Sequence, residues 1–180
     1  MPYKNPRIPS SYRKNNLGTT LYETVLSLKP LKIVEFGCLN GYSTVCMAMA
    51  LKELGEGILT VYDLYEEYPY KHASRSEVWK NIEKYGLQDY VRLEKGDFYQ
   101  WIRHPEPFDL LHVDISNDGD IIELLDRGLR HRKGGVVLFE GGTKERDEVD
   151  WMIKYGKKAI NSCPVNYKII NTAFPGISRL

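Results

Sequence analysis

The sequence predicts an α/β fold, in which a doubly wound and mostly parallel seven-stranded sheet has helices on both faces and an antiparallel terminal hairpin. Short apolar runs of strand length alternate with segments of helical periodicity, which is the pattern of β–α–β units. The first run, Leu31 to Phe36, leads into a turn bounded by Gly37 and Gly41 and then into an apolar helix. The last two runs flank Pro175-Gly176, as expected of a hairpin turn.

The totals indicate one domain over residues 1–180, with residues 1–18 as an N-terminal arm. With 42% hydrophobic and 27% charged residues, the composition is that of a globular protein. A net charge of +1 gives no general attraction to nucleic acid or membranes. Three cysteines without a C-x-x-C pair favour a reducing compartment. No apolar run approaches about 18 residues, and the N-terminus lacks the apolar core of a signal peptide. We therefore expect a cytoplasmic protein.

Local signals place the individual elements. The arm is expected to be solvated or partly disordered, with a flap over a ligand as the alternative. Thr20 and Glu23 have the spacing of a capping box, which predicts a helix that stops before Pro30. A turn is expected at 133–135. Further helices are expected from Ser43 through Leu51, at 76–85, in a short segment reaching Ile102, at 118–129 and at 145–160. Further strands are expected at 58–62, 90–94, 108–114, 136–140, 167–171 and 177–180.

The turn after the first strand has the form of a nucleotide-type site. Glycine lets backbone approach a ligand closely, and a helix N-terminus offers unpaired N–H groups. A dinucleotide fingerprint needs a middle glycine, where this chain has Leu39, and a phosphate loop needs a G-K-S/T ending that is missing. Glu35, a carboxylate on an apolar strand, needs partners, so we expect it to accept from backbone N–H groups or to contact a cation.

The pattern Glu-x-Gly-x-x-x-Gly-Tyr-Ser, from Glu35 to Ser43, resembles motif I of class I S-adenosylmethionine-dependent methyltransferases. It is most similar to the small-molecule O-methyltransferase branch, where a bulkier residue can replace the middle glycine. A plain strand-to-helix turn would have the same local pattern. Over residues 18–180 the resemblance implies a Rossmann-like fold, S-adenosyl-L-methionine as cofactor, S-adenosyl-L-homocysteine as product, and a small-molecule acceptor, with a hydroxyl oxygen as the expected target. The residues of this turn that it assigns to the cofactor are Glu35, Gly37, Cys38, Asn40, Gly41 and Ser43.

Two later strand ends extend this cofactor site. Asp63 lies 22 residues after Gly41, near the distance expected for the carboxylate that binds the ribose hydroxyls, and Leu64 is added as its neighbour. By the resemblance, Gly96 and Asp97 contact the adenine edge, and Phe98 packs on the adenine ring. Asp97 is equally suited to cap the short helix that follows.

The acceptor side depends on the ends of the fourth and fifth strands. Asp114 ends the fourth strand at the carboxyl edge, so it is assigned to catalysis as well as to the cofactor, whereas Asp109 lies at the opposite edge. His112 shares the face of Asp114, and we interpret it as a core histidine. The tyrosine-rich segment 64–72 either walls an acceptor pocket or is a surface connection. His72 is the alternative base to Asp114.

A divalent metal is not expected. Metal-dependent O-methyltransferases hold magnesium with the strand-four acid and an Asp-Asn pair after strand five. Here Glu140 stands for the first residue of the pair, and Gly141 removes the amide. Asp114 and Glu140 alone remain a less favoured magnesium site.

Other functions are weighed against this one. The same fold could bind the cofactor without catalysis, and a nicotinamide-dependent oxidoreductase would need the missing glycine. A nucleic-acid base methyltransferase would show an Asn- or Asp-Pro-Pro-aromatic tetrad, where this chain has Asp114-Ile115-Ser116-Asn117. Protein substrates and a homo-oligomer stay open.

Overall fold

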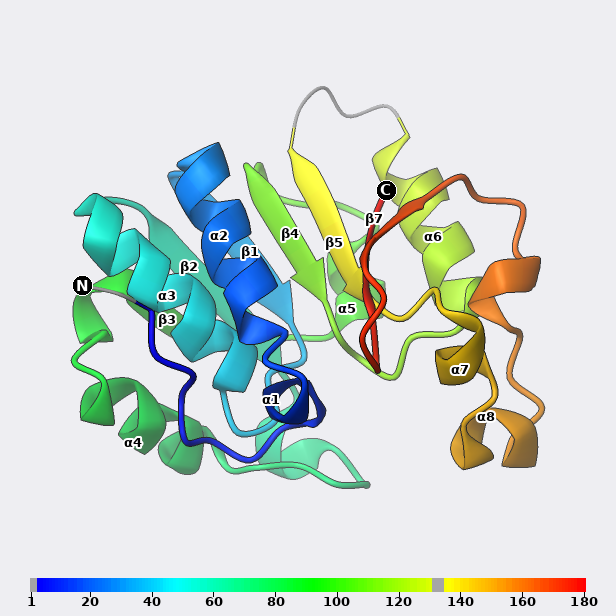
Figure 1. Ribbon diagram of the computed structural model, residues 1–180, viewed down its shortest axis with the longest axis horizontal. Helices are drawn as coiled ribbons and strands as arrows, with labels where there is room; N and C mark the ends of the chain where they lie inside the picture. Colours follow the sequence, from blue (N-terminus) through cyan, green and yellow to red (C-terminus); the bar gives the residue numbers. More distant parts are fainter. Residues whose placement is uncertain (1–2, 131–134) are drawn as a thin grey trace.

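One seven-stranded sheet organises the computed structural model, which describes residues 3–130 and 135–180 (Figure 1). Its order is β3-β2-β1-β4-β5-β7-β6. The strands β1 to β5 are parallel, and β7 is antiparallel to both of its neighbours, which confirms the predicted topology. The strands are β1 (Lys32–Phe36), β2 (Ile58–Asp63), β3 (Val91–Lys95), β4 (Leu110–Val113), β5 (Val136–Glu140), β6 (Lys168–Asn171) and β7 (Ile177–Arg179).

Helices cover both faces of this sheet. They are α1 (Ser11–Lys14), α2 (Gly18–Leu28), α3 (Tyr42–Leu54), α4 (Arg75–Lys84), α5 (Phe98–Trp101), α6 (Gly119–Leu129), α7 (Lys144–Asp147) and α8 (Asp150–Lys154). Three single turns of 3₁₀ helix are η1 (Tyr65–Glu67), η2 (Gln88–Tyr90) and η3 (Ile160–Ser162). Of the turn predicted at 133–135, the first two residues, Lys133 and Gly134, lie outside the described residues.

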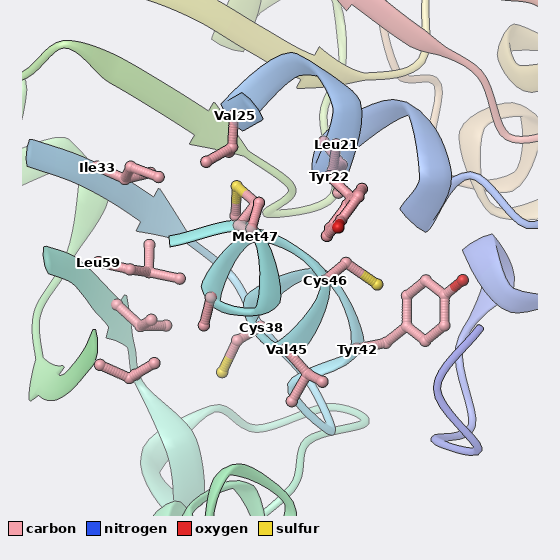
Figure 2. Close-up of a cluster of buried hydrophobic side chains, with 14 of the residues drawn as sticks. Leu21, Tyr22, Val25, Ile33, Cys38, Tyr42, Val45, Cys46, Met47 and Leu59 are labelled. Carbon is pink, nitrogen blue, oxygen red and sulfur yellow. The ribbon is translucent and has the colours of Figure 1, made fainter. Parts of the chain in front are cut away.

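Alternation along each strand divides the core between the two faces. Ile33 packs in the cluster of α2, α3 and α4, whereas its neighbour Val34 packs with α5 and α6. Figure 2 shows the first cluster, in which side chains of α2 and α3 gather against Ile33 and Leu59. Because successive strand residues point to opposite faces, both faces of the central strands are buried. This arrangement is the doubly wound architecture that the sequence predicts.

Two predicted helices are wrong in detail. The first, α2, begins at Gly18 rather than at a capping box, because Thr20 lies inside the helix and its hydroxyl accepts from Asn171 at 2.8 Å. The helix expected over 145–160 is broken into α7, α8 and η3. Asp147 ends α7, and its carboxylate accepts the backbone N–H groups of Ile160 and Asn161 at 3.0 and 2.9 Å, which holds the chain in a compact loop.

The N-terminal arm packs its apolar side chains into the domain, so the prediction of a solvated or partly disordered terminus is wrong for these side chains, whereas the basic residues of the arm are exposed. Ser10 caps α1 by accepting from the backbone N–H of Tyr12. Ile8, Tyr12 and Leu17 are buried in the cluster shared by α2 and α3. The apolar side chains are spaced too irregularly to produce a helical or strand pattern, which explains why the sequence does not predict their burial.

Asp109 lies at the edge of the sheet opposite the glycine turn, and its carboxylate has a structural role only. Asp109 Oδ2 accepts the backbone N–H groups of Leu31 and Lys32, each at 2.9 Å. Replacing Asp109 with alanine leaves both donors without this partner, so we expect the free energy of unfolding to fall by about 1–3 kcal/mol. Urea denaturation measures this change, and unaltered stability would contradict it.

Candidate functional site

A cavity of about 560 Å³ opens at the carboxyl ends of the parallel strands. It lies beside the ends of β1 and β4, where the strand order changes direction, which is the position at which open α/β sheets bind ligands. Of the predicted site residues, Glu35 and Gly41 do not line it. Those that do are Gly37, Cys38, Asn40, Ser43, Asp63, Leu64, His72, Gly96, Asp97, Phe98 and Asp114.

Gly37 is required by a close approach of the chain to itself. Its φ is +80°, and a Cβ built there would lie 2.0 Å from the carbonyl oxygen of Asp114. Hydrogen bonds extend beyond the strand ends on both sides, from Gly37 N–H to Tyr62 and from Asp114 N–H to Phe36, at 3.0 and 2.8 Å. The glycine therefore joins the ends of β1, β2 and β4 into one rigid floor.

Asp63 fastens the glycine turn to the end of β2. Its Oδ2 accepts from the backbone N–H of Cys38 at 2.8 Å, and its Oδ1 accepts from that of Tyr65 at 2.9 Å. An ionised carboxylate can accept about four hydrogen bonds, and Asp63 lines the cavity. It therefore keeps acceptor capacity for a ligand.

The segment after β3 forms an aromatic wall. Asp97 caps α5 by accepting from Gln100 N–H at 3.1 Å, which confirms the capping interpretation, and it also lines the cavity. Phe98 is only 4% exposed and packs edge-on against Phe36, with ring centroids 5.4 Å apart. Tyr99, which the sequence analysis missed, is 51% exposed and lines the same cavity. An aromatic residue directly after Asp97 and Phe98 was the available signal.

Glu35 lies beneath the cavity in a buried network. It accepts from two side chains, the Thr44 hydroxyl at 2.5 Å and His112 Nδ1 at 3.1 Å, rather than from backbone N–H groups, the first of the two alternatives expected for it. His112 Nε2 is 3.3 Å from the Tyr12 hydroxyl, and His112 is fully buried, so its interpretation as a hydrogen-bonded core histidine is confirmed. The network connects the N-terminal arm to β1 and β4.

Arg146 is a site residue that the sequence does not predict. It pairs with Glu140, which the sequence offered as a possible metal ligand. The guanidinium donates from Nε to Glu140 Oε1 at 2.5 Å and from Nη2 to Oε2 at 2.9 Å. In the sequence, Arg146 lies in a highly charged segment that looks solvent-exposed, yet it is only 5% exposed. Tertiary contacts bring Arg146 to the cavity, and no local sequence pattern predicts those contacts.

The residues at this place do not fit a divalent metal. Both oxygens of Glu140 already accept from Arg146, and a guanidinium beside them repels a cation. In the described part of the chain, no three acidic, histidine or cysteine side chains are grouped to hold a metal ion. Magnesium needs near-octahedral oxygen ligation, which Asp114 alone does not supply.

Two carboxyl groups, Asp114 after β4 and Glu140 at the end of β5, line the cavity and interact electrostatically. Burial, with the charge of Asp114 second, raises the pKa of Glu140 to about 7 despite the lowering effect of Arg146. Burial likewise raises the pKa of Asp114, against the lowering charges of His112 and Arg146. Because two neighbouring carboxylates oppose each other's ionisation, this pair can take up a proton near neutral pH.

The raised pKa of Glu140 predicts a pH-dependent stability. A carboxyl whose pKa is higher in the folded state contributes stability below its unfolded value of 4.5, and this contribution is lost as pH rises through about 7. As pH rises from 4.5 to about 7, the wild type should therefore lose stability relative to Glu140→Gln. Urea denaturation at several pH values measures it, and a difference independent of pH would contradict the shift.

The outer wall comes from three segments far apart in the sequence. Tyr68, Tyr70 and His72 line the cavity, as does Trp151. His72 Nδ1 is 2.7 Å from the Tyr70 carbonyl oxygen, so that ring nitrogen donates and Nε2 is left as an acceptor. Residues 9–11 of the arm also line the cavity, which supports the flap alternative.

Comparison with known proteins decides the family. A family model described as a methyltransferase domain matches residues 34–140, more than half of the chain. The chain belongs to this methyltransferase-domain family. The methyltransferase domain is 31% identical over 111 residues to a catechol O-methyltransferase of Niastella koreensis. The match covers 59% of the chain and 46% of that relative, so the chain spans about half the relative's length.

Solved structures share its Rossmann-like fold. The O-methyltransferase from Bacillus cereus in complex with SAH superposes with a TM-score of 0.63 at 20% identity, covering 97% of this chain and 83% of the other. TomG of Streptomyces achromogenes, an O-methyltransferase of tomaymycin synthesis in complex with SAM, gives 0.63 at 18%, with coverages of 94% and 84%. In the part of the methyltransferase domain that the structure describes, no helix is long and apolar enough to cross a membrane.

Proposed function

We propose that the domain is an S-adenosylmethionine-dependent methyltransferase that methylates a hydroxyl oxygen of a small molecule. One observation carries the proposal: the Gly37 turn, Asp63 and Asp97 come from the ends of three neighbouring strands and line one cavity. Their order matches the extended shape of the cofactor, with the methionine part at the turn, the ribose hydroxyls at Asp63 and the adenine edge at Asp97. The SAM- and SAH-bound relatives support the same ligand.

The electrostatics of the cavity suit a cationic methyl donor. Asp63, Asp97, Asp114 and Glu140 all line it, whereas Arg146 is a buried cation paired with Glu140. The donor carries a positive sulfonium and an amino group, which carboxylates attract. A dinucleotide with its anionic pyrophosphate would be repelled by the same groups. These charges favour the methyl donor over the nicotinamide alternative.

Asp114 is our candidate base. It is half-buried, lines the cavity at the end of β4 and has a raised pKa. The hydroxyl proton passes to this carboxylate while the oxygen forms a bond to the methyl carbon. The carbon–sulfur bond breaks, and its electron pair stays on sulfur, which becomes a neutral thioether. His72, whose Nε2 is left as an acceptor, is the alternative base.

Asp63→Ala tests the ribose subsite. Losing hydrogen bonds to a charged acceptor should weaken S-adenosylmethionine binding by about 1.5–3 kcal/mol, as measured by isothermal titration. The matched control is Asp109→Ala, which also removes a carboxylate that accepts two backbone N–H groups, but at the opposite edge of the sheet. Equal loss of affinity in both variants would show that Asp63 acts only through stability.

Transfer of a labelled methyl group from S-adenosylmethionine to a panel of phenols and sugars tests the activity. Product with at least one hydroxyl acceptor supports the proposal. Cofactor binding without transfer to any acceptor would instead favour the catalytically inactive alternative.

We further propose a single domain in a cytoplasmic setting. All strands of the described residues join one sheet, and the N-terminal arm packs into its core. Cys38, Cys46 and Cys163 are free thiols, which suits a reducing compartment.

A further inference from the structure

Arg146 is a fixed cation in the cavity wall, and the methyl transfer proposed above gives it no role. Glu140 binds its Nε and Nη2, and the carbonyl oxygen of Asn117 lies 3.5 Å from Nη2. The Trp151 ring covers the guanidinium, with 4.9 Å between Cζ and the ring centroid. The guanidinium therefore has a defined position and little freedom to turn.

The remaining nitrogen, Nη1, lacks an acceptor. It is buried and has no hydrogen-bond partner among residues 3–130 and 135–180. Leaving a charged donor buried and unpaired costs free energy. Nη1 itself is covered, but Arg146 lines the cavity, so an oxygen atom of a bound ligand can become the missing acceptor once the side chains that cover this nitrogen shift.

The position of this cation matters for the chemistry. It lies on Glu140 at the end of β5, and its charge also lowers the pKa of Asp114 at the end of β4. A cation there stabilises negative charge on a nearby oxygen, which is the effect a Lewis-acidic metal would supply. The residues here do not fit a metal ion, but they place the positive charge of Arg146 where the charge of a metal would act.

We propose that Arg146 binds the reacting oxygen of the acceptor as an oxyanion, in place of a divalent metal. This inference rests on the proposed methyl transfer. The ligand class is a compound with one acidic hydroxyl on an aromatic ring. One guanidinium nitrogen serves a single oxygen, whereas a metal ion chelates two adjacent ones, so a second hydroxyl is not needed. Trp151 provides an aromatic surface beside Arg146, and Tyr68 and Tyr70 add aromatic surface elsewhere on the cavity wall.

Ionisation of bound 4-nitrophenol tests this without requiring turnover, because its phenolate is yellow and its phenol is not. At a pH below the free pKa of the probe, the wild type saturated with S-adenosylhomocysteine should increase the phenolate fraction. The variant Arg146→Gln with Glu140→Gln should lose this increase. Changing both residues avoids leaving Glu140 buried without its partner. Thermal denaturation confirms that the double variant is folded.

Two single variants serve as controls. Arg146→Lys keeps a cation and should retain part of the phenolate increase. Lys71→Gln removes an exposed cation from the rim of the same cavity and should leave the increase unchanged. If Lys71→Gln abolishes it instead, the oxyanion is bound by Lys71 and the proposal is overturned. Absence of any phenolate increase in the wild type would also overturn it.

Turnover gives an independent readout. Methylation of a monophenol should continue in excess EDTA, and the double variant should lose about tenfold to a hundredfold in kcat/KM, the range for a hydrogen bond to a charged group. Loss of activity in EDTA with recovery on adding magnesium would overturn the role of Arg146 while leaving methyl transfer intact. Failure of S-adenosylhomocysteine to bind would instead count against the proposed function.

Discussion

Asp114→Asn should lower kcat for methyl transfer by about 10²–10⁴-fold, the usual contribution of a general base. The amide has nearly the shape of the carboxylate but cannot take the hydroxyl proton. Because burial raises the pKa of Asp114, the wild-type rate should rise with pH as this group loses its proton. The variant should lack that rise, while its affinity for S-adenosylhomocysteine falls far less. Steady-state kinetics across pH measure both effects.

His72→Asn is the matched control for this experiment. His72 lines the same cavity, but it belongs to the exposed segment after η1 and its Nδ1 donates to Tyr70. It should keep most of the activity if Asp114 is the base. A large loss in His72→Asn together with an active Asp114→Asn would exchange the two assignments.

Gly37→Val should abolish cofactor binding and destabilise the domain. The new Cβ would lie 2.0 Å from the Asp114 carbonyl oxygen, and φ of +80° is unfavourable for a β-branched residue. We expect affinity to fall by about 100-fold or more, equivalent to about 2.7 kcal/mol. The free energy of unfolding should fall by about 3 kcal/mol. Titration calorimetry and urea denaturation measure the two losses.

Gly55→Val separates backbone strain from the clash. Gly55 has φ of +79°, almost the same as Gly37, but a Cβ there would meet nothing within 4 Å. This variant should lose only the stability that the backbone conformation costs and keep its cofactor affinity. Equal behaviour of the two variants would show that the approach of Gly37 to Asp114 does not shape the site.

Much of the fold could be predicted because its signals are local. The apolar runs at β1, β4 and β5 are buried on both faces, so they remain recognisable as central strands. Gly37 follows β1 directly and Asp63 is the last residue of β2, and the parallel topology brings these strand ends to one edge. The strand ends and the resemblance to the methyltransferase motifs together therefore predict where the cavity lies.

The missed features depend on contacts between distant segments. Tyr12 is buried through the arm's packing and its contact with His112, 100 positions further along the chain. Arg146 is buried because of its partner Glu140, and α7 ends at Asp147, which accepts backbone N–H groups from η3, beyond α8. A charged segment such as 144–148 has no periodicity that would reveal these partners. Polar networks of this kind become visible only when tertiary structure is known.

Titration calorimetry of the wild type with S-adenosylmethionine, S-adenosylhomocysteine and NAD tests the central claim most directly. The arrangement of Gly37, Asp63 and Asp97 around one cavity predicts micromolar binding of both sulfur compounds and none of NAD. Binding of NAD, or of neither sulfur compound, would contradict the assignment of this cavity to the methyl donor.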